Sequence, residues 1–558
     1  MDIIYVTYNS EMWIDACFNA LLKSNYNIKQ INIFVLDNNS TDKTVEKLYQ
    51  NSELCQNKFG KFEIVQSEIN LGFGRANNLA FGKGNSDIAV FLNIDTEVYE
   101  NTLNILEREI KSGPYNAAMW EMRQIPYEHP KIYNPVTMET SWCSGAAFAV
   151  KREVFQKLGG FDEKFFMYVE DVDLSWRFRA NNYKIIYCPK AVIKHYSYKT
   201  SGETKPTQYI FTTINNLIMR YRYGSFRNIL GWYRTFFHIL RSPSEFVGVK
   251  QQLIKRWLHV LRLKGYLKKT KIIKKEFTPQ FIGFDYERVR SGGFYENKFP
   301  NFSPLISVIV RTCGRPCVLR EALISIRNQT YSNIEIVIVE DGKPQSKQMI
   351  EEEFGDLNIK YFATEIRVGR SKAGNLAMKI AAGEYFNFLD DDDLFYADHI
   401  EVLVSKLEKT DCLAVYSIGC ETKILVNSYS PYIYNLFDYN EVHKQKFDKL
   451  MLCHHNYIPI QCIMFHKSLF NSHGGFDETL DSLEDWDLWV RYSLYTNFEF
   501  VEKTTSLYRV PYNDVQNRER QKNLDEALKI VREKHKLYNQ TLSVNELAKI
   551  YEKIISNN

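Results

Sequence analysis

The feature that most constrains this chain is an internal repeat, in which landmarks of the first part recur in the second part in the same order. The paired landmarks are Ile3–Thr7 with Val308–Thr312, Ile33–Asp37 with Ile336–Asp341, Asn70–Ala80 with Arg367–Ala377, Phe91–Asp95 with Phe388–Asp392, Gly159–Glu163 with Gly474–Glu478, and Glu170–Leu174 with Glu484–Leu488. The third pair aligns without a gap, and its register continues into the fourth. A chain of 558 residues also exceeds what one hydrophobic core supports. We therefore predict two copies of one domain.

The alternation of short apolar runs with helical stretches indicates the fold class of each copy. Thr41–Gln50 and Arg320–Gln329 have the pattern of helices that follow buried strands. This order is typical of an α/β fold with a mostly parallel, Rossmann-like sheet covered by helices. The predicted organisation is a first domain at 1–200, a helical connector at 201–300, a second domain at 301–515 and a helical tail at 516–558.

Carboxylates follow several of the predicted strands. Ligands of such sheets bind beyond the carboxyl ends of the strands. We therefore expect one cleft in each domain to be lined by the acids at these ends, which are Asp37, Asp95, Asp341 and Asp392.

An acidic run in the second copy, Asp390–Asp393, matches what a divalent cation needs. Mg²⁺ and Mn²⁺ prefer oxygen ligands, and a few carboxylates leave coordination positions open for phosphate oxygens. The first copy offers only Asn93 and Asp95 at this place, so its site carries less charge. The alternative is that such acids are turn or helix-cap residues.

A second acidic pair begins a predicted helix in each copy. Asp171 and Asp485 follow a glutamate and precede an apolar, aromatic segment that ends in an arginine about two turns later. An acid at a helix N-terminus is stabilised as its anion, so it is a usable base for a hydroxyl proton. The alternative is a helix cap with a surface salt bridge.

Together these motifs resemble family 2 glycosyltransferases of the GT-A fold, over about residues 2–200 and 304–512. The first half resembles bacterial rhamnosyltransferase-type members, whose metal strand often reads Leu-Asn-x-Asp, as Leu92–Asp95 does here after the segment Asn70–Gly74. The second half resembles members with an all-acidic metal motif. The resemblance is specific for the family and says little about the sugar.

The resemblance implies roles for individual residues. The implied donor-binding residues are Thr7, Asp37, Arg75, Asn93, Thr312, Asp341 and Lys372. The implied metal ligands are Asp95, His195, Asp390 and Asp392, and the acceptor-side residues are Glu170, Glu484 and Trp142. Asp171 and Asp485 are the implied bases. His195 follows a strand-like run, and a lone histidine can also be structural; the matching segment of the second copy, Tyr508–Pro511, has no histidine.

The same resemblance implies an inverting reaction with Mn²⁺ or Mg²⁺, in which each domain transfers one sugar from a UDP- or dTDP-sugar. The acceptor would be a glycan or lipid-linked glycan of capsule or O-antigen type. One rival interpretation keeps a single active domain and makes the other a carbohydrate-binding or scaffold module. A nucleotidyltransferase is a second rival, but it needs a glycine-rich loop after the first strand, and Thr7–Ser10 does not provide one.

The predicted connector is basic and aromatic between about 220 and 275. Such a segment suits peripheral contact with an anionic membrane, or helices that pack their aromatic residues against a domain. The net charge of +4 and the absence of a recognition motif argue against nucleic acid. The sequence starts without a signal-peptide pattern and holds no long apolar run, so we expect a cytoplasmic protein.

Overall fold

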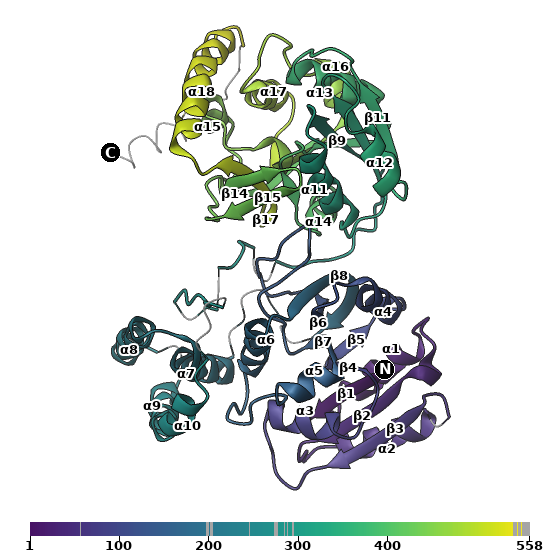
Figure 1. The fold of residues 1–558 in the computed structure, drawn as a ribbon, viewed down its shortest axis with the longest axis vertical. Coiled ribbons are helices and arrows are strands. Elements are labelled where there is room, and N and C mark those ends of the chain that lie inside the picture. Colours follow the sequence, from purple (N-terminus) through teal and green to yellow (C-terminus); the bar gives the residue numbers. More distant parts are fainter. Residues whose placement is uncertain are drawn as a thin grey trace. The chain divides into compact units, whose positions relative to one another are not determined.

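The structure is a computed structural model. It describes residues 1–55, 57–196, 200, 203, 205–244, 246–272, 277–283, 285–286, 288–292, 295–538, 544 and 548. The chain forms two compact units, Met1–Lys298 and Phe299–Asn558, which Figure 1 shows. Within the described ranges, every helix is too short or too polar to span a bilayer.

The first unit contains one eight-stranded sheet in the order β3-β2-β1-β4-β7-β6-β8-β5. Its strands are β1 (Asp2–Thr7), β2 (Asn32–Asp37), β3 (Lys61–Gln66), β4 (Ile88–Leu92), β5 (Thr96–Val98), β6 (Ala117–Ile125), β7 (Ala147–Lys151) and β8 (Lys184–His195). The first four strands of this order run parallel. The sheet becomes mixed beyond them, because β7 pairs antiparallel with β4 and β6, and β5 pairs antiparallel with β8. The predicted α/β class is confirmed.

Helices cover both faces of this sheet. They are α1 (Ile14–Leu22), η1 (Ile28–Gln30), α2 (Thr44–Leu54), α3 (Phe73–Phe81), α4 (Thr102–Ser112), α5 (Arg152–Lys157) and α6 (Glu170–Ala180). Successive strand residues point to opposite faces. Accordingly, Ile3 and Tyr5 pack with α1, α2 and α4, whereas Ile4 packs with α3, α5 and α6.

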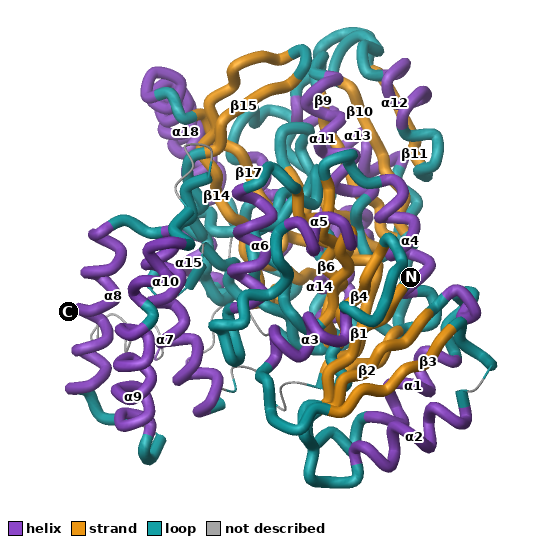
Figure 2. Tube along the Cα trace, turned by 60° about the horizontal axis from the view of Figure 1, so that its bottom comes forward, coloured by secondary structure: helices purple, strands orange, loops and turns teal. Residues whose placement is uncertain are grey.

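Four further helices belong to the first unit. They are α7 (Pro206–Tyr223), α8 (Phe226–Arg241), α9 (Val249–Arg262) and α10 (Lys264–Lys269). Their core, which includes Trp232 and Phe236, packs against Trp176 of α6. In Figures 1 and 2, α6 lies between these helices and the sheet. Of the predicted connector, residues 201–202, 204, 245, 273–276, 284, 287 and 293–294 lie outside the described residues.

The second unit repeats this topology. Its sheet has the order β11-β10-β9-β12-β16-β14-β17-β13, with β15 added beside β14. The strands are β9 (Ile306–Thr312), β10 (Ile334–Glu340), β11 (Ile359–Ala363), β12 (Tyr385–Phe388), β13 (Leu394–Phe395), β14 (Ala414–Tyr429), β15 (Tyr432–Leu436), β16 (Ile463–His466) and β17 (Phe498–Pro511). The helices are α11 (Pro316–Arg327), α12 (Lys347–Glu353), α13 (Arg370–Ile380), α14 (His399–Leu407), α15 (Lys449–His454), η2 (Ile460–Cys462), α16 (Lys467–His473), α17 (Glu484–Ser493) and α18 (Asp514–His535).

Helix boundaries differ from the predicted ones for local reasons. α2 begins at Thr44, three residues later than predicted, and the Asp42 side chain in the turn before it accepts from the Thr44 backbone N–H at 3.0 Å. α11 begins earlier than predicted, at Pro316, since proline suits the first helical position. In the predicted tail, α18 packs Val531 into the core of the second unit. From residue 539 on, only 544 and 548 are described.

Candidate active site

The carboxyl ends of β1 and β2 bring two predicted donor-binding residues together. Thr7 and Asp37 lie side by side in the parallel register, and the Thr7 hydroxyl donates to Asp37 Oδ1 at 2.9 Å. The Ser40 backbone N–H and hydroxyl also donate to Asp37, at 3.0 and 2.6 Å. Asp37 is therefore a buried, fully hydrogen-bonded carboxylate at the end of its strand.

The corresponding residue of the second unit is not Asp341. The register pairs Thr312 with Glu340, so Glu340 occupies the place of Asp37, and Asp341 lies one residue beyond the strand. The structural counterpart of Asp341 is Asn38. Each accepts a backbone N–H from the segment before α3 or α13, Asn38 from Leu71 at 2.7 Å and Asp341 from Val368 at 2.6 Å. The sequence alignment that paired Asp37 with Asp341 is therefore wrong by one residue.

A glycine with a positive φ precedes the third helix of both units. Gly72 (φ 80°) and Gly369 (φ 92°) are the N-caps of α3 and α13. A Cβ on Gly72 would lie 2.2 Å from the Phe166 carbonyl oxygen, so no side chain fits there. The first turns of these helices carry Arg75, whose Nε lies 3.8 Å from Glu163, and Lys372, which is exposed.

In each unit an asparagine joins two of the repeated sequence landmarks, the segment of α3 or α13 and the Gly-Gly-Phe-Asp-Glu loop. Asn78 Nδ2 donates to the Phe161 carbonyl at 2.8 Å, and the Phe161 N–H donates back to Asn78 Oδ1 at 2.9 Å. Asn375 makes the same two bonds to Phe476, at 2.9 and 2.8 Å. The Gly-Gly-Phe-Asp-Glu loop of each unit is therefore fastened to α3 or α13, beside the predicted site.

Two predicted metal ligands of the first unit face each other. The pairing of β5 with β8 places Asp95 Oδ1 3.4 Å from His195 Nε2. Gln124 Oε1 lies 2.7 Å from His195 Nδ1. An amide oxygen only accepts, so Nδ1 carries the proton and Nε2 presents its lone pair toward Asp95. That tautomer belongs to the neutral ring; in the protonated ring Nε2 carries a proton as well and faces the carboxylate as a cation. Burial disfavours the charged form of Asp95, but the hydrogen bond and charge of the protonated His195 outweigh it and lower the Asp95 pKa.

Asp95 and His195 are two side chains of the kind that bind a divalent cation, and they would leave its other coordination positions open. Carboxylate oxygen and imidazole nitrogen are both suitable ligands for Mn²⁺. Among the described residues, no group of three or more His, Cys, Asp or Glu side chains is arranged to hold a metal. Asn93 contributes its backbone here: its N–H donates to Ala146 at 2.9 Å and its carbonyl accepts from Thr96 at 2.6 Å.

The predicted base of the first unit lies in the first turn of α6. Asp171 accepts backbone N–H groups from Gly145 and Val172, each at 2.8 Å. The helix is entered through Tyr168 and Val169, both with positive φ (65° and 76°), which is a strained conformation for residues of this kind. Burial raises the pKa of Asp171, although the two N–H donors oppose the rise. The neighbouring Glu170 is buried, its Oε2 makes no hydrogen bond to a described residue, and burial raises its pKa well above the ordinary value.

Asp485 lies in the first turn of α17 in the same way. It accepts from the Trp486 N–H at 2.8 Å and from Asn456 Nδ2 at 3.0 Å. The preceding Leu483 is also left-handed, with φ 59°. Burial, followed by the charge of Glu484, raises the pKa of Asp485 to about 7.

The acidic run of the second unit is held by arginines. Arg311 occupies the strand position of Val6 and is buried. Its guanidinium donates to both oxygens of Asp390, each at 2.8 Å, and to Glu484 Oε1 at 2.9 Å. Burial opposes ionisation of Asp390, but Arg311 outweighs it and lowers the Asp390 pKa.

The rest of the run is similarly engaged. Arg315 contacts Asp391 and lies 3.1 Å from Asp392 Oδ2, while the Arg509 N–H donates to Asp393 at 3.1 Å. The pairing of β13 with β17 puts Tyr508 at the place of His195, and its hydroxyl donates to Glu421 at 2.5 Å. As arranged, these residues do not offer open ligands to a cation, because Asp390, Asp391 and Asp392 bind arginine side chains and Tyr508 takes the place of His195.

The predicted acceptor-side residues are placed in the interior. Trp142 is 9% exposed and packs between His129 and the Lys131 ammonium. Glu170 and Glu484 are buried beneath the bases that they precede. A role for these three at the acceptor stays a prediction.

Several residues that contact the site escaped the sequence analysis. Gln124, Gly145 and Asn456 act through single hydrogen bonds to His195, Asp171 and Asp485 and leave no motif in the sequence. Arg311 did leave a signal, since it is a cation inside the apolar run Ile306–Thr312.

The chain shares sequence similarity with a known protein family and with several proteins. The model of Glycosyl transferase family 2 matches residues 2–175 and 307–472, which together make up more than half of the chain. An uncharacterized glycosyltransferase of Rickettsia typhi is 34% identical over 208 residues, which cover 36% of this chain and 64% of the relative. Chondroitin synthase of Escherichia coli is 25% identical over 268 residues, covering 45% of this chain and 37% of the synthase. The chain thus spans less than two thirds of these relatives.

Solved structures also overlap with parts of the chain. S. aureus TarS 1–349 in complex with UDP-GlcNAc is 18% identical with a TM-score of 0.34, covering 48% of this chain and 83% of that one. The mannosyltransferase PcManGT from Pyrobaculum calidifontis, in complex with GDP-Man and Mn²⁺, is 18% identical with a TM-score of 0.32. It covers 48% of this chain and 72% of that one.

Proposed function

The chain belongs to glycosyl transferase family 2, and we propose that it is a bifunctional inverting glycosyltransferase. Each unit would transfer one sugar from a UDP- or dTDP-sugar to a growing bacterial surface glycan of capsule or O-antigen type. The observation that carries this proposal is the duplicated base. Asp171 and Asp485 both lie in the first turn of a helix that starts after a left-handed residue, and both have a raised pKa.

In the proposed reaction, the acceptor hydroxyl gives its proton to Asp171 or Asp485 as its oxygen attacks the anomeric carbon. The bond from that carbon to the nucleoside diphosphate breaks in the same step, so the configuration inverts. A carboxylate with a raised pKa is a stronger base than an ordinary one. The hydrogen bonds from Gly145 and Asn456 hold each carboxylate in one orientation while it accepts the proton.

The two units would stabilise the leaving diphosphate differently. In the first, Asp95 and His195 would hold Mn²⁺ or Mg²⁺, which neutralises charge on the phosphates when bound. Arg75, which is exposed on the first turn of α3, would add a positive charge. In the second unit the cations are Arg315 and Lys372, and Arg315 is 43% exposed at its side chain. A cation role for Asp390 and Asp392 there stays a prediction.

A donor panel tests this function. UDP- and dTDP-sugars would be supplied with Mn²⁺ or Mg²⁺, and nucleoside-diphosphate release and glycan elongation followed for the wild type, Asp171→Ala and Asp485→Ala. We expect each substitution to lower transfer of a different sugar by about 10²–10⁴-fold. Loss of neither activity would contradict the assignment of the bases.

One observation favours the alternative of a single active domain. The acidic run of the second unit binds arginines, and Tyr508 stands where the first unit has His195. If Asp485→Ala changes no transfer while Asp171→Ala abolishes all of it, the second unit is a carbohydrate-binding or scaffold module. The rhamnosyltransferase-type likeness of the first unit is tested by including dTDP-rhamnose in the panel.

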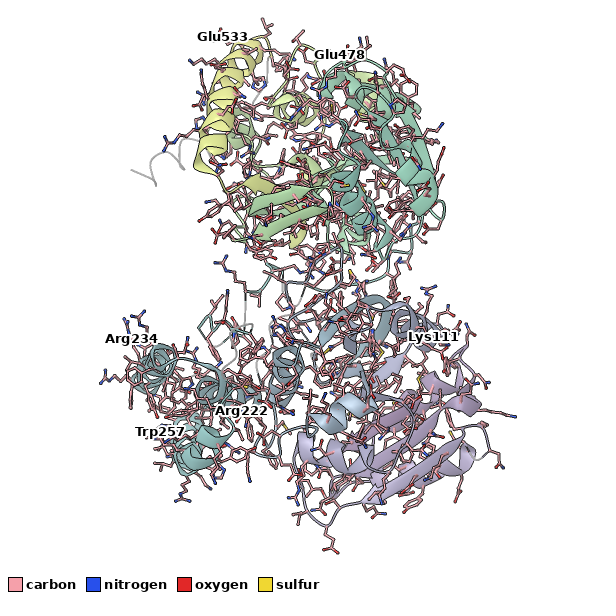
Figure 3. The ribbon with its side chains drawn as sticks, in the orientation of Figure 1. Lys111, Arg222, Arg234, Trp257, Glu478 and Glu533 are labelled. Carbon is pink, nitrogen blue, oxygen red and sulfur yellow. The ribbon has the colours of Figure 1, made fainter. Side chains whose placement is uncertain are left out.

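We also propose that the enzyme works at the inner face of the cell membrane, through an apolar surface on α8 and α9. This surface consists of Phe226, Leu230, Phe237, Ile254 and Leu258, which are 78%, 58%, 44%, 40% and 48% exposed. Exposed cations accompany it, namely Arg227, Arg234, Arg241, Lys255 and Arg262. Figure 3 shows Arg234 and Trp257 on these helices. Each cation adds about 1 kcal/mol at an anionic membrane.

Vesicle sedimentation tests this contact. The full chain is expected to bind vesicles of anionic phosphatidylglycerol, to bind neutral phosphatidylcholine weakly, and to be released by salt. The double variant Leu230→Asp/Phe237→Asp should lose binding. Tyr115→Asp, at another exposed aromatic residue, is the matched control and should bind normally. Equal binding by the double variant would rule out this surface.

A further inference from the structure

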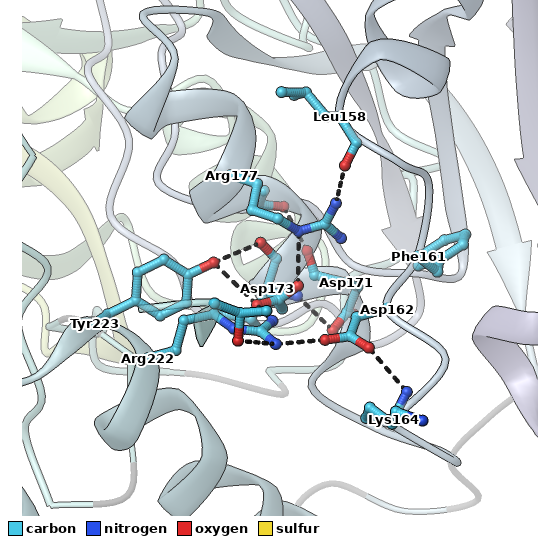
Figure 4. A network of polar contacts seen from close by, with 12 residues as sticks. Leu158, Phe161, Asp162, Lys164, Asp171, Asp173, Arg177, Arg222 and Tyr223 are labelled. Atoms are coloured by element: carbon cyan, nitrogen blue, oxygen red, sulfur yellow. Dashed lines mark hydrogen bonds and ion pairs between the residues drawn. The ribbon is translucent and has the colours of Figure 1, made fainter. Parts of the chain in front are cut away.

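In each unit, the helix that follows the last strand along the chain contacts the helix that carries the proposed base. In the first unit this following helix is α7, and in the second it is α18. The contact point is the second aspartate after each glutamate of the repeated motif, Asp173 in α6 and Asp487 in α17, both fully buried. Figure 4 shows the contacts of the first unit.

In the first unit, Arg222 of α7 joins two carboxylates. Its guanidinium donates to Asp173 Oδ1 and Asp162 Oδ2, each at 2.5 Å. The adjacent Tyr223 hydroxyl donates to Asp173 Oδ1 at 2.9 Å. Asp173 is therefore bound from its own helix by Arg177, at 2.8 Å, and from α7 by a cation and a hydroxyl.

The second unit has the same arrangement with different residues. Lys534 of α18 donates to Asp487 Oδ2 at 2.8 Å and lies 2.6 Å from Asp477 Oδ2. Tyr538 donates to Asp487 Oδ1 at 2.9 Å, and Arg491 donates from within α17 at 2.9 Å. Asp477 is the counterpart of Asp162 in the repeated Gly-Gly-Phe-Asp-Glu loop.

The spacing along the chain is also repeated. The bridging cations, Arg222 and Lys534, follow their buried aspartates by 49 and 47 residues, and the tyrosines follow by 50 and 51. The surrounding sequences differ, and arginine is replaced by lysine. Two independent copies thus keep one cation that joins the same two carboxylates, which a chance surface contact does not explain.

These contacts are made in the same helical turn that carries the proposed base. Asp171 and Asp485 are two residues before the buried aspartates, in the same helical turn. The loop that carries Asp162 is itself held to α3 by Asn78. In the first unit α7 additionally holds the strained entry to α6, because Asn215 Nδ2 donates to the carbonyls of Met167 and Tyr168 at 2.9 and 2.8 Å.

We propose that Arg222 and Lys534 are positioning residues, through which α7 and α18 hold in place the helices that carry Asp171 and Asp485. Each catalytic unit then includes its following helix, so α7 and α18 are parts of the repeat. A misplacement of the base by about 1 Å costs on the order of 10²-fold in rate. This inference rests on the proposed function for its effect on turnover, whereas its structural part stands without it.

The test uses the full chain with Arg222→Met and Lys534→Met. The matched controls are Arg108→Met on α4 and Lys529→Met on α18, whose side chains are exposed. Hydrogen exchange of the backbone over 166–175 and 480–489 gives a readout that needs no activity. Turnover is measured as nucleoside-diphosphate release from the sugar donor assigned to each unit.

We expect Arg222→Met to speed exchange over 166–175 alone and to lower kcat for the first donor by about 10–100-fold, with its KM little changed. Lys534→Met should do the same for 480–489 and the second donor. Arg222→Lys should restore most of the loss, since lysine serves in the other unit. Tyr223→Phe and Tyr538→Phe, which remove one hydroxyl each, should give smaller effects of the same kind if the methionine variants do not fold.

The proposal would be overturned if exchange and kcat were unchanged in the two methionine variants, Arg222→Met and Lys534→Met, and in the two phenylalanine variants, Tyr223→Phe and Tyr538→Phe. Faster exchange throughout the unit would also overturn it, since that indicates general loss of structure. A rise in KM with kcat unchanged would overturn it too, since that indicates lost substrate binding and not a misplaced base. If the wild type transfers no sugar from any donor, the proposed function fails, and the exchange data alone decide whether the following helices position α6 and α17.

Discussion

Asp95 and His195 face each other across two antiparallel strands, with 3.4 Å between Asp95 Oδ1 and His195 Nε2. They are a hundred residues apart in the chain, and the pairing of β5 with β8 brings them together. Gln124 accepts from the far nitrogen of the ring. In the neutral ring, the hydrogen bond from Nδ1 to Gln124 leaves the lone pair of Nε2 facing the carboxylate of Asp95.

We predict that Gln124→Leu lowers Mn²⁺ affinity about 10–100-fold, because the imidazole loses the partner that sets its tautomer and orientation. The measurement is calorimetric titration of Mn²⁺ in the presence of UDP. His195→Ala should have a larger effect, and Gln50→Leu, at an exposed glutamine of α2, should have none. Unchanged Mn²⁺ affinity in His195→Ala would exclude this pair as a cation site.

We predict that transfer by the second unit falls as the pH drops through about 7. The Asp485 pKa is raised to about 7, so below that pH the carboxyl group is protonated and cannot accept a proton from the acceptor. The measurement is the pH dependence of kcat for the sugar that Asp485→Ala fails to transfer. An acidic limb with its midpoint near the ordinary value of about 4 would contradict this prediction.

We predict that Arg311→Met destabilises the second unit by about 3–5 kcal/mol. The substitution leaves the buried carboxylates of Asp390 and Glu484 without their shared cation. The measurement is the free energy of unfolding in urea. Arg320→Met is the control, because its ion pair with Glu353 is half exposed and contributes about 0–1 kcal/mol. If the two variants lost equal free energies of unfolding, the buried ion pairs of Arg311 would contribute no more stability than the exposed pair of Arg320.

We predict that Gly72→Ala is more destabilising than Gly159→Ala. Both glycines have φ 80°, which costs an alanine about 1–2 kcal/mol. A Cβ on Gly159 meets no atom within 4 Å, whereas one on Gly72 would lie 2.2 Å from the Phe166 carbonyl oxygen. The difference in unfolding free energy between the two variants therefore measures the clash alone. No difference would mean that the turn before α3 adjusts freely.

The repeat in the sequence allowed much of the site to be predicted. The doubled landmarks predicted two α/β units, and the topology of the two sheets agrees. They also pointed to Asp171 and Asp485, which the structure places in equivalent helical turns. These predictions worked because strand ends, glycines with positive φ and helix starts are local features that a short stretch of sequence specifies.

Other parts of the site depend on contacts between distant segments. The pairing of Asp37 with Asp341 was one residue out of register, because sequence alone does not say at which residue a parallel strand stops pairing. The neutralisation of Asp390 by Arg311 crosses 79 residues. The apolar run around Arg311 predicted a buried strand correctly, but it did not reveal which acids the buried cation would meet.

The sequence by itself determined the number of units, their fold class and the residue types at the carboxyl ends of the strands, since hydrophobic periodicity and turn chemistry act over a few residues. Only the tertiary structure decided which of those groups are free to act. It gave Asp95 a histidine, gave Asp390 an arginine, and brought Arg222 and Lys534 behind the two bases. The reason is physical: the charge state and orientation of a buried carboxylate depend on the donors packed around it, and those donors come from strands and helices far away in the chain.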